Sequence, residues 1–239
     1  MRHLRAVLDF LYPPRCPACR RRTEAPAFCL GCRGRILPAR SPLCSACGLP
    51  FIGQGPDHLC ANCHLHPPGF RQARARAAFD GHQASPLVEV LARFKYGRDV
   101  TMAAVLAGFL VEQLPMTLYH DLVVPIPLHR DRLRWRGFNQ ALPLARAIAR
   151  KGTCPVDPFV LARRRSTPPQ VGLGAADRRR NVKGAFVVRN REQVRDRTIL
   201  LVDDVMTTGA TAHECARVLR AAGARHVDAI VLARALDPS

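Results

Sequence analysis

The amino-acid sequence predicts an α/β protein with a mostly parallel sheet and flanking helices, preceded by a small cysteine-rich module. Beyond residue 69, short apolar runs typical of buried strands alternate with segments of helical periodicity. This alternation implies parallel strands joined by helices, and ligands of such sheets bind beyond the carboxyl ends of the strands. A chain of 239 residues, 48% of them hydrophobic, is long enough for one such domain and a small module.

Eight of the ten cysteines lie in the first 63 residues and form four Cys-x-x-Cys pairs. The two-residue gap turns both sulfurs toward one point, so two pairs complete a tetrahedral site of four thiolates. We therefore expect about two structural zinc ions in a double zinc ribbon, with an iron–sulfur cluster as the alternative. Consecutive pairing gives two similar units, and the spacing leaves interleaved pairing open. The expected metal ligands are Cys16, Cys19, Cys29, Cys32, Cys44, Cys47, Cys60 and Cys63.

The stretch His66-Pro67-Pro68-Gly69 marks the end of this module, which gives predicted domains of 1–69 and 70–239. A ribbon this short has almost no apolar core, so metal ligation would supply its folding energy. Besides that structural role, the module could present arginines to a nucleic acid or cap the following domain.

The second domain is predicted to alternate strands and helices along its whole length. Asn139 is a suitable N-cap for one helix, with Pro143 in its first turn. The predicted strands are 74–79, 121–126, 159–162, 185–188, 198–202 and 227–233. The predicted helices are 86–94, 101–114, 139–151 and 212–222.

The stretch from Ile199 to Thr211, Ile-Leu-Leu-Val-Asp-Asp-Val-Met-Thr-Thr-Gly-Ala-Thr, is the most informative motif. A buried strand is followed by two carboxylates, a loop of small hydroxyl residues and a helix. The first N–H groups of a helix lack partners and lie at the positive end of its dipole, so they bind anions. The carboxylates would repel a phosphate and suit ribose hydroxyls or a divalent cation. The motif therefore predicts a pocket for a ribose 5-phosphate.

A second loop follows the strand at 121–126 and is rich in arginine. It reads Pro-Leu-His-Arg from Pro127 to Arg130 and continues through Arg132, Arg134 and Arg136. Guanidinium groups grip phosphate oxygens in a bidentate manner. The alternative is a solvated basic loop with no ligand.

The stretch 199–211 resembles the PRPP (phosphoribosyl pyrophosphate) binding motif of type I phosphoribosyltransferases. Other segments are similar to the ComF family of phosphoribosyltransferase-like proteins, of the ComFC and GntX type. The resemblance covers nearly the whole chain, including its cysteine-rich start. The segments that carry it are Pro-Ile-Pro-Leu-His-Arg (125–130), Arg-Gly-Phe-Asn-Gln-Ala (136–141), Phe-Lys-Tyr-Gly (94–97), Thr-Pro-Pro-Gln (167–170) and Arg-Arg-Arg-Asn-Val-Lys-Gly-Ala-Phe (178–186).

The resemblance implies a type I phosphoribosyltransferase-like fold that binds PRPP with magnesium on its pyrophosphate. It also implies transfer of the phosphoribosyl group with release of pyrophosphate. Asp203 and Asp204 are expected to act catalytically, by holding the ribose hydroxyls and stabilising positive charge at the ribose C1 atom. No nucleobase-recognition motif is visible, so the acceptor stays open. The expected substrate-binding residues are Thr207, Thr208, Gly209, Ala210, Thr211, His129, Arg130, Arg134, Arg136, Lys95 and Gln170.

The segment 163–182 is basic, contains proline and glycine, and lacks apolar periodicity. It fits the mobile loop that covers the active site of phosphoribosyltransferases and excludes water. The alternative is an ordinary exposed connection.

The formal charge of +19 favours phosphate-rich partners, although arginine abundance from GC-rich codons explains such an excess equally well. We expect binding of single-stranded DNA, and the resemblance adds a role in DNA uptake (competence) with other competence or DNA-processing proteins as partners. The second hypothesis is a non-catalytic DNA-binding adaptor on the same scaffold. No signal peptide or membrane span is apparent, so a cytoplasmic protein with reduced thiols is expected.

Overall fold

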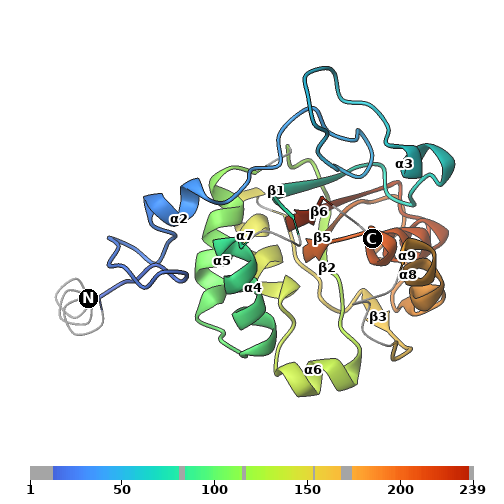
Figure 1. The fold of residues 1–239 in the computed structure, drawn as a ribbon. Helices are drawn as coiled ribbons and strands as arrows, with labels where there is room; N and C mark the ends of the chain where they lie inside the picture. The colour runs from blue at the N-terminus through green and yellow to red at the C-terminus, as the bar shows by residue number, and fades with distance from the viewer. Residues whose placement is uncertain (1–12, 81–83, 115–116, 153, 168–173, 237–239) are drawn as a thin grey trace.

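The computed structural model describes residues 13–80, 84–114, 117–152, 154–167 and 174–236. Within these residues the central sheet has four parallel strands in the order β1-β6-β5-β2 (Figure 1). All three neighbouring pairs are parallel, as the alternation of strands and helices predicts. The strands are β1 (Ala73–Phe79), β2 (Leu122–Pro125), β5 (Thr198–Met206) and β6 (His226–Ala235).

Helices cover both faces of this sheet, which explains the continuous apolar runs 199–202 and 229–233 in its central strands. Along β5, Leu200 and Val202 contribute to one hydrophobic core, and Ile199 and Leu201 contribute to the other. Successive side chains of a strand point to opposite faces, so a stretch of strand that is covered on both sides favours apolar residues at consecutive positions. Each fully buried Leu or Ile contributes about 1.5–3 kcal/mol relative to an exposed one.

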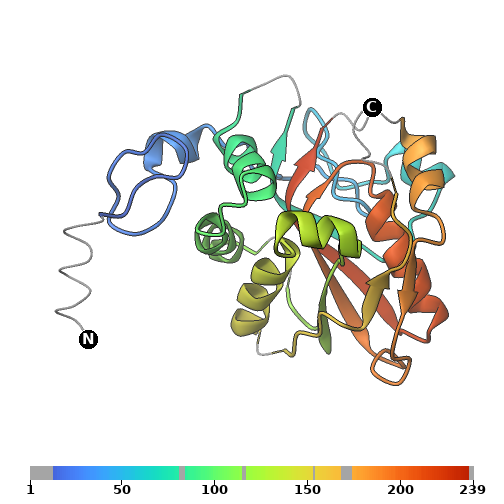
Figure 2. The ribbon, with the colours of Figure 1, turned by 90° about the horizontal axis from the view of Figure 1, so that it is seen from below.

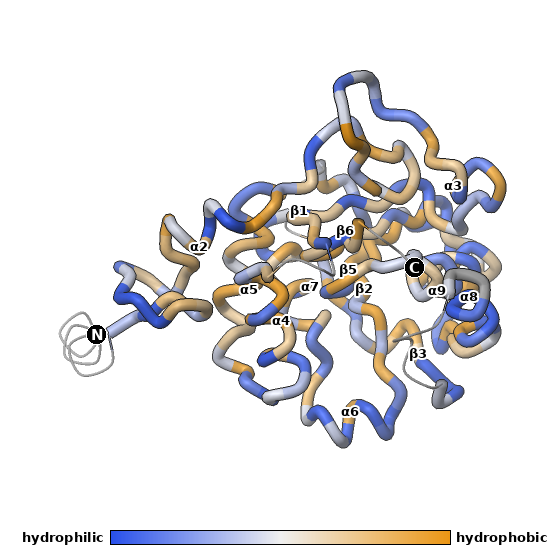
Figure 3. Tube along the Cα trace, viewed as in Figure 1, coloured by the Kyte–Doolittle hydropathy of each residue, from blue (hydrophilic) through white to orange (hydrophobic). Residues whose placement is uncertain are grey.

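Three helices, α4, α5 and α7, lie on one face, and α9 lies on the other with α8 beside it (Figures 1 and 2). Figure 3 shows that hydrophobic residues concentrate in the sheet and the facing helices. The predicted N-cap at Asn139 is confirmed, since its Oδ1 accepts a hydrogen bond from the N–H of Ala141 at 3.0 Å. The helices are α4 (Pro86–Tyr96), α5 (Met102–Glu112), α7 (Ala141–Gly152), α8 (Ala175–Val182) and α9 (Ala210–Ala221).

Two predicted strands do not join the parallel sheet. Strands β3 (Leu161–Arg163) and β4 (Phe186–Val188) pair with each other in antiparallel fashion instead. They are only three residues long, and nothing in such short runs indicates which strand they pair with.

Two helices lie where the sequence predicts loops. One is α6 (Arg130–Arg136), which begins after His129 and ends at Gly137 with a left-handed φ of 86°. The other is α8, which occupies part of the predicted cover loop 163–182, while 168–173 lie outside the described residues. Both are short and largely hydrophilic (Figure 3), so they lack the apolar periodicity that identifies a helix in a sequence.

The two cysteine units dock on opposite faces of the domain. The first, residues 16–32 with α2 (Leu30–Gly34), buries Cys16 and Phe28 in the same core as α4 and α5. The second, residues 44–63 with α3 (Ala61–Leu65), joins the core beneath α9. Figure 1 shows α2 beside α5, and α3 beside α8 and α9. The cysteine-rich segment is therefore part of both cores.

The second unit is held tightly against strand β1. The N–H of Ala73 donates to the carbonyl oxygen of Ala46 at 2.6 Å. A Cβ atom at Gly48 would lie 2.5 Å from the carbonyl oxygen of Ala73, and the φ of Gly48 is +67°. Only glycine fits this close approach and this backbone conformation.

Consecutive cysteine pairing is confirmed. The four sulfurs of Cys16, Cys19, Cys29 and Cys32 lie within 4.8 Å of one another, and so do those of the second set, Cys44, Cys47, Cys60 and Cys63. The Sγ–Sγ distances are 3.6 Å for Cys19 and Cys29, and 3.8 Å for Cys47 and Cys60. A tetrahedron with zinc–sulfur bonds of about 2.3 Å has edges of about 3.8 Å. Both sets therefore fit a structural zinc ion.

In the part of the chain that the structure describes, none of the helices has the length and apolar character needed to cross a bilayer.

We predict about two zinc ions per chain in elemental analysis of the purified protein. Cys16→Ser and Cys60→Ser should each lose one ion, because each removes a ligand from a different four-thiolate site. Cys215→Ser, which changes a buried cysteine of α9 outside both sites, is the control and should keep both ions. Iron with visible absorbance, or no metal in freshly reduced protein, would overturn the zinc assignment.

Candidate functional site

A cavity of about 200 Å³ opens beyond the carboxyl ends of β2 and β5. This is the edge at which ligands bind to parallel sheets. Its walls come from the end of α4, from α6, from Arg163 at the end of β3 and from the start of α9. The charged side chains that line it are Lys95, Arg132, Arg136, Arg163, Asp203 and Asp204.

Unequal strand lengths create this cavity. The pairing of β5 with β2 extends to Val202 opposite Pro125, whereas its pairing with β6 extends to Met206 opposite Arg234. Strand β5 therefore continues through the two carboxylates, although the sequence suggests that it ends before them. On the β2 side, Asp203 and Asp204 lie beyond the last paired residue, which leaves that edge open to a ligand.

The two carboxylates have different surroundings. Asp204 is buried, and its Oδ2 lies 3.0 Å from the Nζ of Lys95, in the last turn of α4. An uncompensated buried charge is costly, and breaking such a pair typically loses about 3–5 kcal/mol. Lys95 is therefore a counter-ion of the acidic pair as well as a wall of the cavity.

Asp203 is half-buried, and its Oδ1 accepts a hydrogen bond from the N–H of Asp204 at 2.9 Å. Burial and the adjacent Asp204 carboxylate raise the pKa of Asp203 to about 8, and the positive charge of Lys95 only partly offsets them. At neutral pH the acidic pair thus holds a proton that a ligand can displace.

The phosphate-sized loop follows directly. Residues 207–209 form a turn, and α9 begins at Ala210, two residues earlier than predicted. Gly209 has a left-handed φ of 80°, a conformation that glycine adopts without strain. The N–H of Ala210 donates to the Oγ1 of Thr208 at 3.4 Å. The first turn of a 12-residue helix therefore faces the cavity with its positive dipole end.

Two guanidinium groups line the same cavity, that of the buried Arg136 on α6 and that of the half-buried Arg163 on β3. Arg136 donates to the Oε1 of Gln140 at 2.7 Å, and Arg163 donates to the Oγ1 of Thr167. Among the residues that the structure describes, the Nε of each arginine has no hydrogen-bond partner. Burial lowers the pKa of both groups. Two desolvated cations with spare donors are suited to an anionic ligand.

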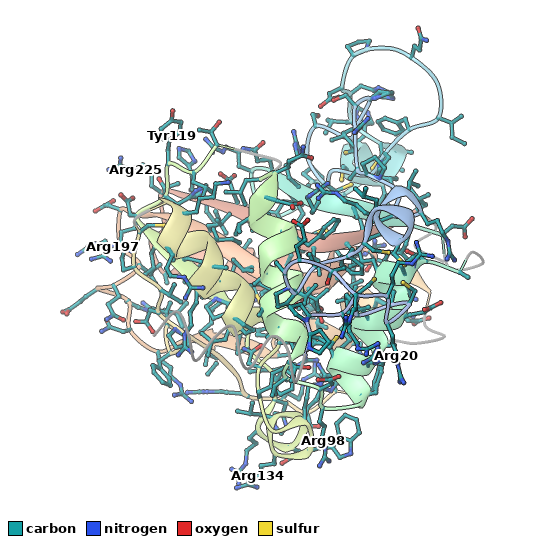
Figure 4. All side chains as sticks on the ribbon, turned by 90° about the vertical axis from the view of Figure 1, so that its left-hand side faces the viewer. Arg20, Arg98, Tyr119, Arg134, Arg197 and Arg225 are labelled. Carbon is teal, nitrogen blue, oxygen red and sulfur yellow. The ribbon has the colours of Figure 1, made fainter. Side chains whose placement is uncertain are left out.

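The structure brings most of the predicted substrate-binding residues to this cavity, but not all. Thr208 lines a smaller neighbouring cleft, together with Cys63. His129, Arg130 and Arg134 do not line the cavity: His129 caps α6, and Arg134 projects into solvent (Figure 4). Gln170 lies outside the described residues. The lining residues among those predicted are Lys95, Arg136, Asp203, Asp204, Thr207, Gly209, Ala210 and Thr211.

Arg163, Gln140 and Tyr96 line the cavity, although they are not among the predicted binding residues. Arg163 reaches it because β3 pairs with β4, a contact that sequence periodicity does not reveal. Tyr96 directly follows the predicted residue Lys95, so its position in the sequence was the signal that could have identified it.

Comparison with known proteins gives two family matches. Residues 7–64 match the double zinc ribbon domain, and residues 139–238 match the phosphoribosyl transferase domain. Both matches agree with the cysteine geometry and with the position of the loop after β5.

Several relatives align with most of the chain. Competence protein F of Haemophilus influenzae is 31% identical over 225 residues, which are 87% of this chain and 96% of the relative. DNA utilization protein YhgH of Escherichia coli K12 is 34% identical, covering 81% and 85% of the two chains. Competence protein ComFC of Streptococcus pneumoniae is 29% identical, covering 81% and 88%. The chain therefore belongs to the ComF family of phosphoribosyltransferase-like proteins with an N-terminal double zinc ribbon.

Proposed function

We propose that this protein binds PRPP in the cavity at the end of β5 and transfers its phosphoribosyl group to an acceptor with release of pyrophosphate. The observation that carries this proposal is that one cavity is lined by both carboxylates and guanidiniums. The carboxylates of Asp203 and Asp204 come from β5, and the guanidiniums of Arg136 and Arg163 come from α6 and β3. PRPP carries hydroxyls and phosphates that match these two kinds of group.

The 5-phosphate would lie on the loop Thr207–Thr211 and the first turn of α9, where N–H groups and the helix dipole favour an anion. The 2- and 3-hydroxyls would donate to the acidic pair. Asp203 is the better acceptor, because Lys95 already engages Asp204.

In the proposed reaction the bond between the ribose C1 atom and pyrophosphate breaks, and a bond from C1 to the acceptor forms. Positive charge develops at C1 while the electron pair leaves with pyrophosphate. The carboxylates stabilise that positive charge, and Arg136 and Arg163 stabilise the leaving group. These charged groups are preorganised around the atoms on which charge develops during the reaction. They therefore stabilise the transition state more than the ground state, which is the requirement for catalysis.

Magnesium is part of the proposal. Its preferred ligands are hard oxygens, and it usually binds through one or two carboxylates together with substrate phosphates. The half-buried carboxylate of Asp203 is suited to such a contact. When bound, magnesium would supply charge neutralisation on the pyrophosphate.

We place this activity in the cytoplasm, since none of the ten cysteines forms a disulfide and zinc ligation needs reduced thiols. The names of the relatives, competence protein F and DNA utilization protein, support a role in the uptake or use of DNA. Other competence or DNA-processing proteins would then be partners.

The second candidate function is a non-catalytic adaptor that binds single-stranded DNA. A specific surface favours it: Tyr96 and Trp135 are exposed, with ring centroids 6.4 Å apart, and the guanidinium of Arg98 lies 5.4 Å from the Trp135 ring. Arg98 and Arg134 project from the same end of the molecule (Figure 4). Aromatic rings flanked by arginines stack bases without sequence preference.

The central experiment is a screen of nucleobases and related amines with PRPP and magnesium, following pyrophosphate release. We expect release with at least one acceptor, and calorimetry should show PRPP binding without any acceptor. Asp203→Asn with Asp204→Asn should weaken PRPP binding about tenfold or more while the protein stays folded, because the carboxylates that would accept from the ribose hydroxyls are lost. Unchanged affinity in this double variant would contradict the proposed ribose contact. PRPP binding without turnover would favour the adaptor.

We predict that PRPP affinity rises with pH as Asp203 titrates. Its raised pKa of about 8 means that the carboxyl is protonated below that pH and must ionise to accept hydroxyl hydrogen bonds. Affinity should rise by up to about tenfold per pH unit below the pKa and level off above it. Calorimetry in buffers of different ionisation enthalpy should detect a released proton. Asp203→Asn is the control, because PRPP itself still titrates in that experiment while residue 203 does not. An equal pH dependence in both proteins would refute this origin.

Binding of single-stranded DNA should be weakly sequence-selective and should fall steeply with salt, because phosphate contacts release counter-ions. Two arginines of the basic segments 130–136 and 178–180, Arg136 and Arg178, are buried, which leaves fewer for DNA. Trp135→Ala should weaken binding about tenfold if a base stacks there. Anisotropy titrations at several salt concentrations measure both effects. Negligible affinity at low salt would rule the adaptor out.

A further inference from the structure

Arg234, near the carboxyl end of β6, is a buried cation that the proposed reaction does not use. Its exposed fraction is only 3%. A guanidinium stays protonated in proteins, so this charge must be compensated by neighbours. The groups that compensate this charge come from two segments that lie far apart in the sequence. One is the start of the phosphate-sized loop, at residues 206–207, which we call the phosphate loop, and the other is the second cysteine unit.

The loop side of Arg234 consists of backbone carbonyls. Its Nη1 donates to the carbonyl oxygens of Met206, at 3.2 Å, and of Thr207. In a trans peptide the C=O and N–H point in opposite directions. Holding these two carbonyls therefore turns the N–H groups of Thr207 and Thr208 away from Arg234, at the start of the loop that would receive a phosphate.

The other side of Arg234 faces a metal ligand. Its Nη2 lies 3.7 Å from the Sγ of Cys47, in the second cysteine unit. In the described part of the chain, Arg234 has no carboxylate partner. A zinc ion held by four thiolates carries a net charge of −2, and it fixes the position of Cys47. The filled second site is thus the counter-charge of Arg234.

We propose that Arg234 is a positioning residue that couples the second zinc site to the phosphate loop. Metal in this site fixes the guanidinium, which fixes the carbonyls of Met206 and Thr207 and so preorganises the loop for an anion. Loss of that metal frees Cys47 to move away from Arg234 and so loosens the loop. The part that concerns ligand affinity rests on the proposed PRPP binding, and the part that concerns loop order does not.

The first cysteine unit provides an internal comparison. It docks against α4 and α5, on the opposite face of the sheet from α9. The second unit, in contrast, borders the loop directly, since Cys63, Phe70 and Thr208 share one small cleft. Two zinc sites of the same ligand type therefore differ in their relation to the loop.

Hydrogen exchange of the amides at 206–211, in protein without ligand, tests the coupling. Cys60→Ser removes a ligand of the second site without touching Arg234, and Cys19→Ser is the matched change in the first site. Arg234→Met removes the cation, and Arg225→Met changes an exposed arginine at the other end of β6 (Figure 4). We expect exchange to quicken about tenfold or more in Cys60→Ser and Arg234→Met, and less than about twofold in the two controls.

Equal quickening in Cys60→Ser and Cys19→Ser would overturn the proposal, because it would mean that either zinc site merely stabilises the whole fold. Unchanged loop exchange in Arg234→Met would overturn it as well. If PRPP fails to bind wild-type protein, the proposed function fails, and the exchange comparison still decides the coupling.

Zinc release from the wild-type protein covers the case in which Arg234→Met does not fold. Coupling is reciprocal. If a metal ion in the second site strengthens PRPP binding, bound PRPP must equally strengthen the binding of that metal ion. PRPP should slow the release of one of the two zinc ions to a chelator by about tenfold. In Cys60→Ser, PRPP should leave the release of the remaining ion unchanged. Bound PRPP that slows neither ion, or both equally, would contradict the proposal.

Discussion

The ion pair between Lys95 and Asp204 is the interaction on which the site depends. A carboxylate buried at the end of a central strand is tolerated only with a counter-ion. The Nζ of Lys95 lies 3.0 Å away and comes from the last turn of α4. This pair anchors α4 at the rim of the cavity and brings Tyr96 to its wall. It also leaves Asp203 as the carboxylate that can accept from a ligand.

Much of the fold is predictable from the sequence, because both faces of the sheet are covered. Continuous apolar runs predict β2, β5 and β6, and the Cys-x-x-Cys spacing predicts both metal sites. The acidic pair and the loop after it predict the place of the cavity. What periodicity does not reveal are α6 and α8, which are polar, and the pairing of β3 with β4. Those elements carry or support Arg136 and Arg163, so the cationic wall of the cavity was predicted only in part.

The cysteine-rich segment does more than cap the α/β domain. Its units dock on opposite faces and extend both cores, with the second unit lying against β1 and α9. The Sγ of Cys47 and the carbonyls of Met206 and Thr207 meet at one guanidinium, that of Arg234. A metal site and the loop at 207–211 that share one buried cation are expected to influence each other. The sequence alone does not predict this link, since Arg234 lies in an apolar strand and is far along the chain from both Cys47 and Thr207.

The central claim is that one cavity binds the ribose, the 5-phosphate and the pyrophosphate of a single ligand. Calorimetric titration of the wild-type protein with PRPP and with ribose 5-phosphate, both with magnesium, tests it most directly. We predict one site for each ligand, with PRPP bound at least about tenfold more tightly because Arg136 and Arg163 contact its pyrophosphate. Equal affinity for both ligands would contradict the role of the two arginines, and binding of neither would contradict the assignment of the cavity.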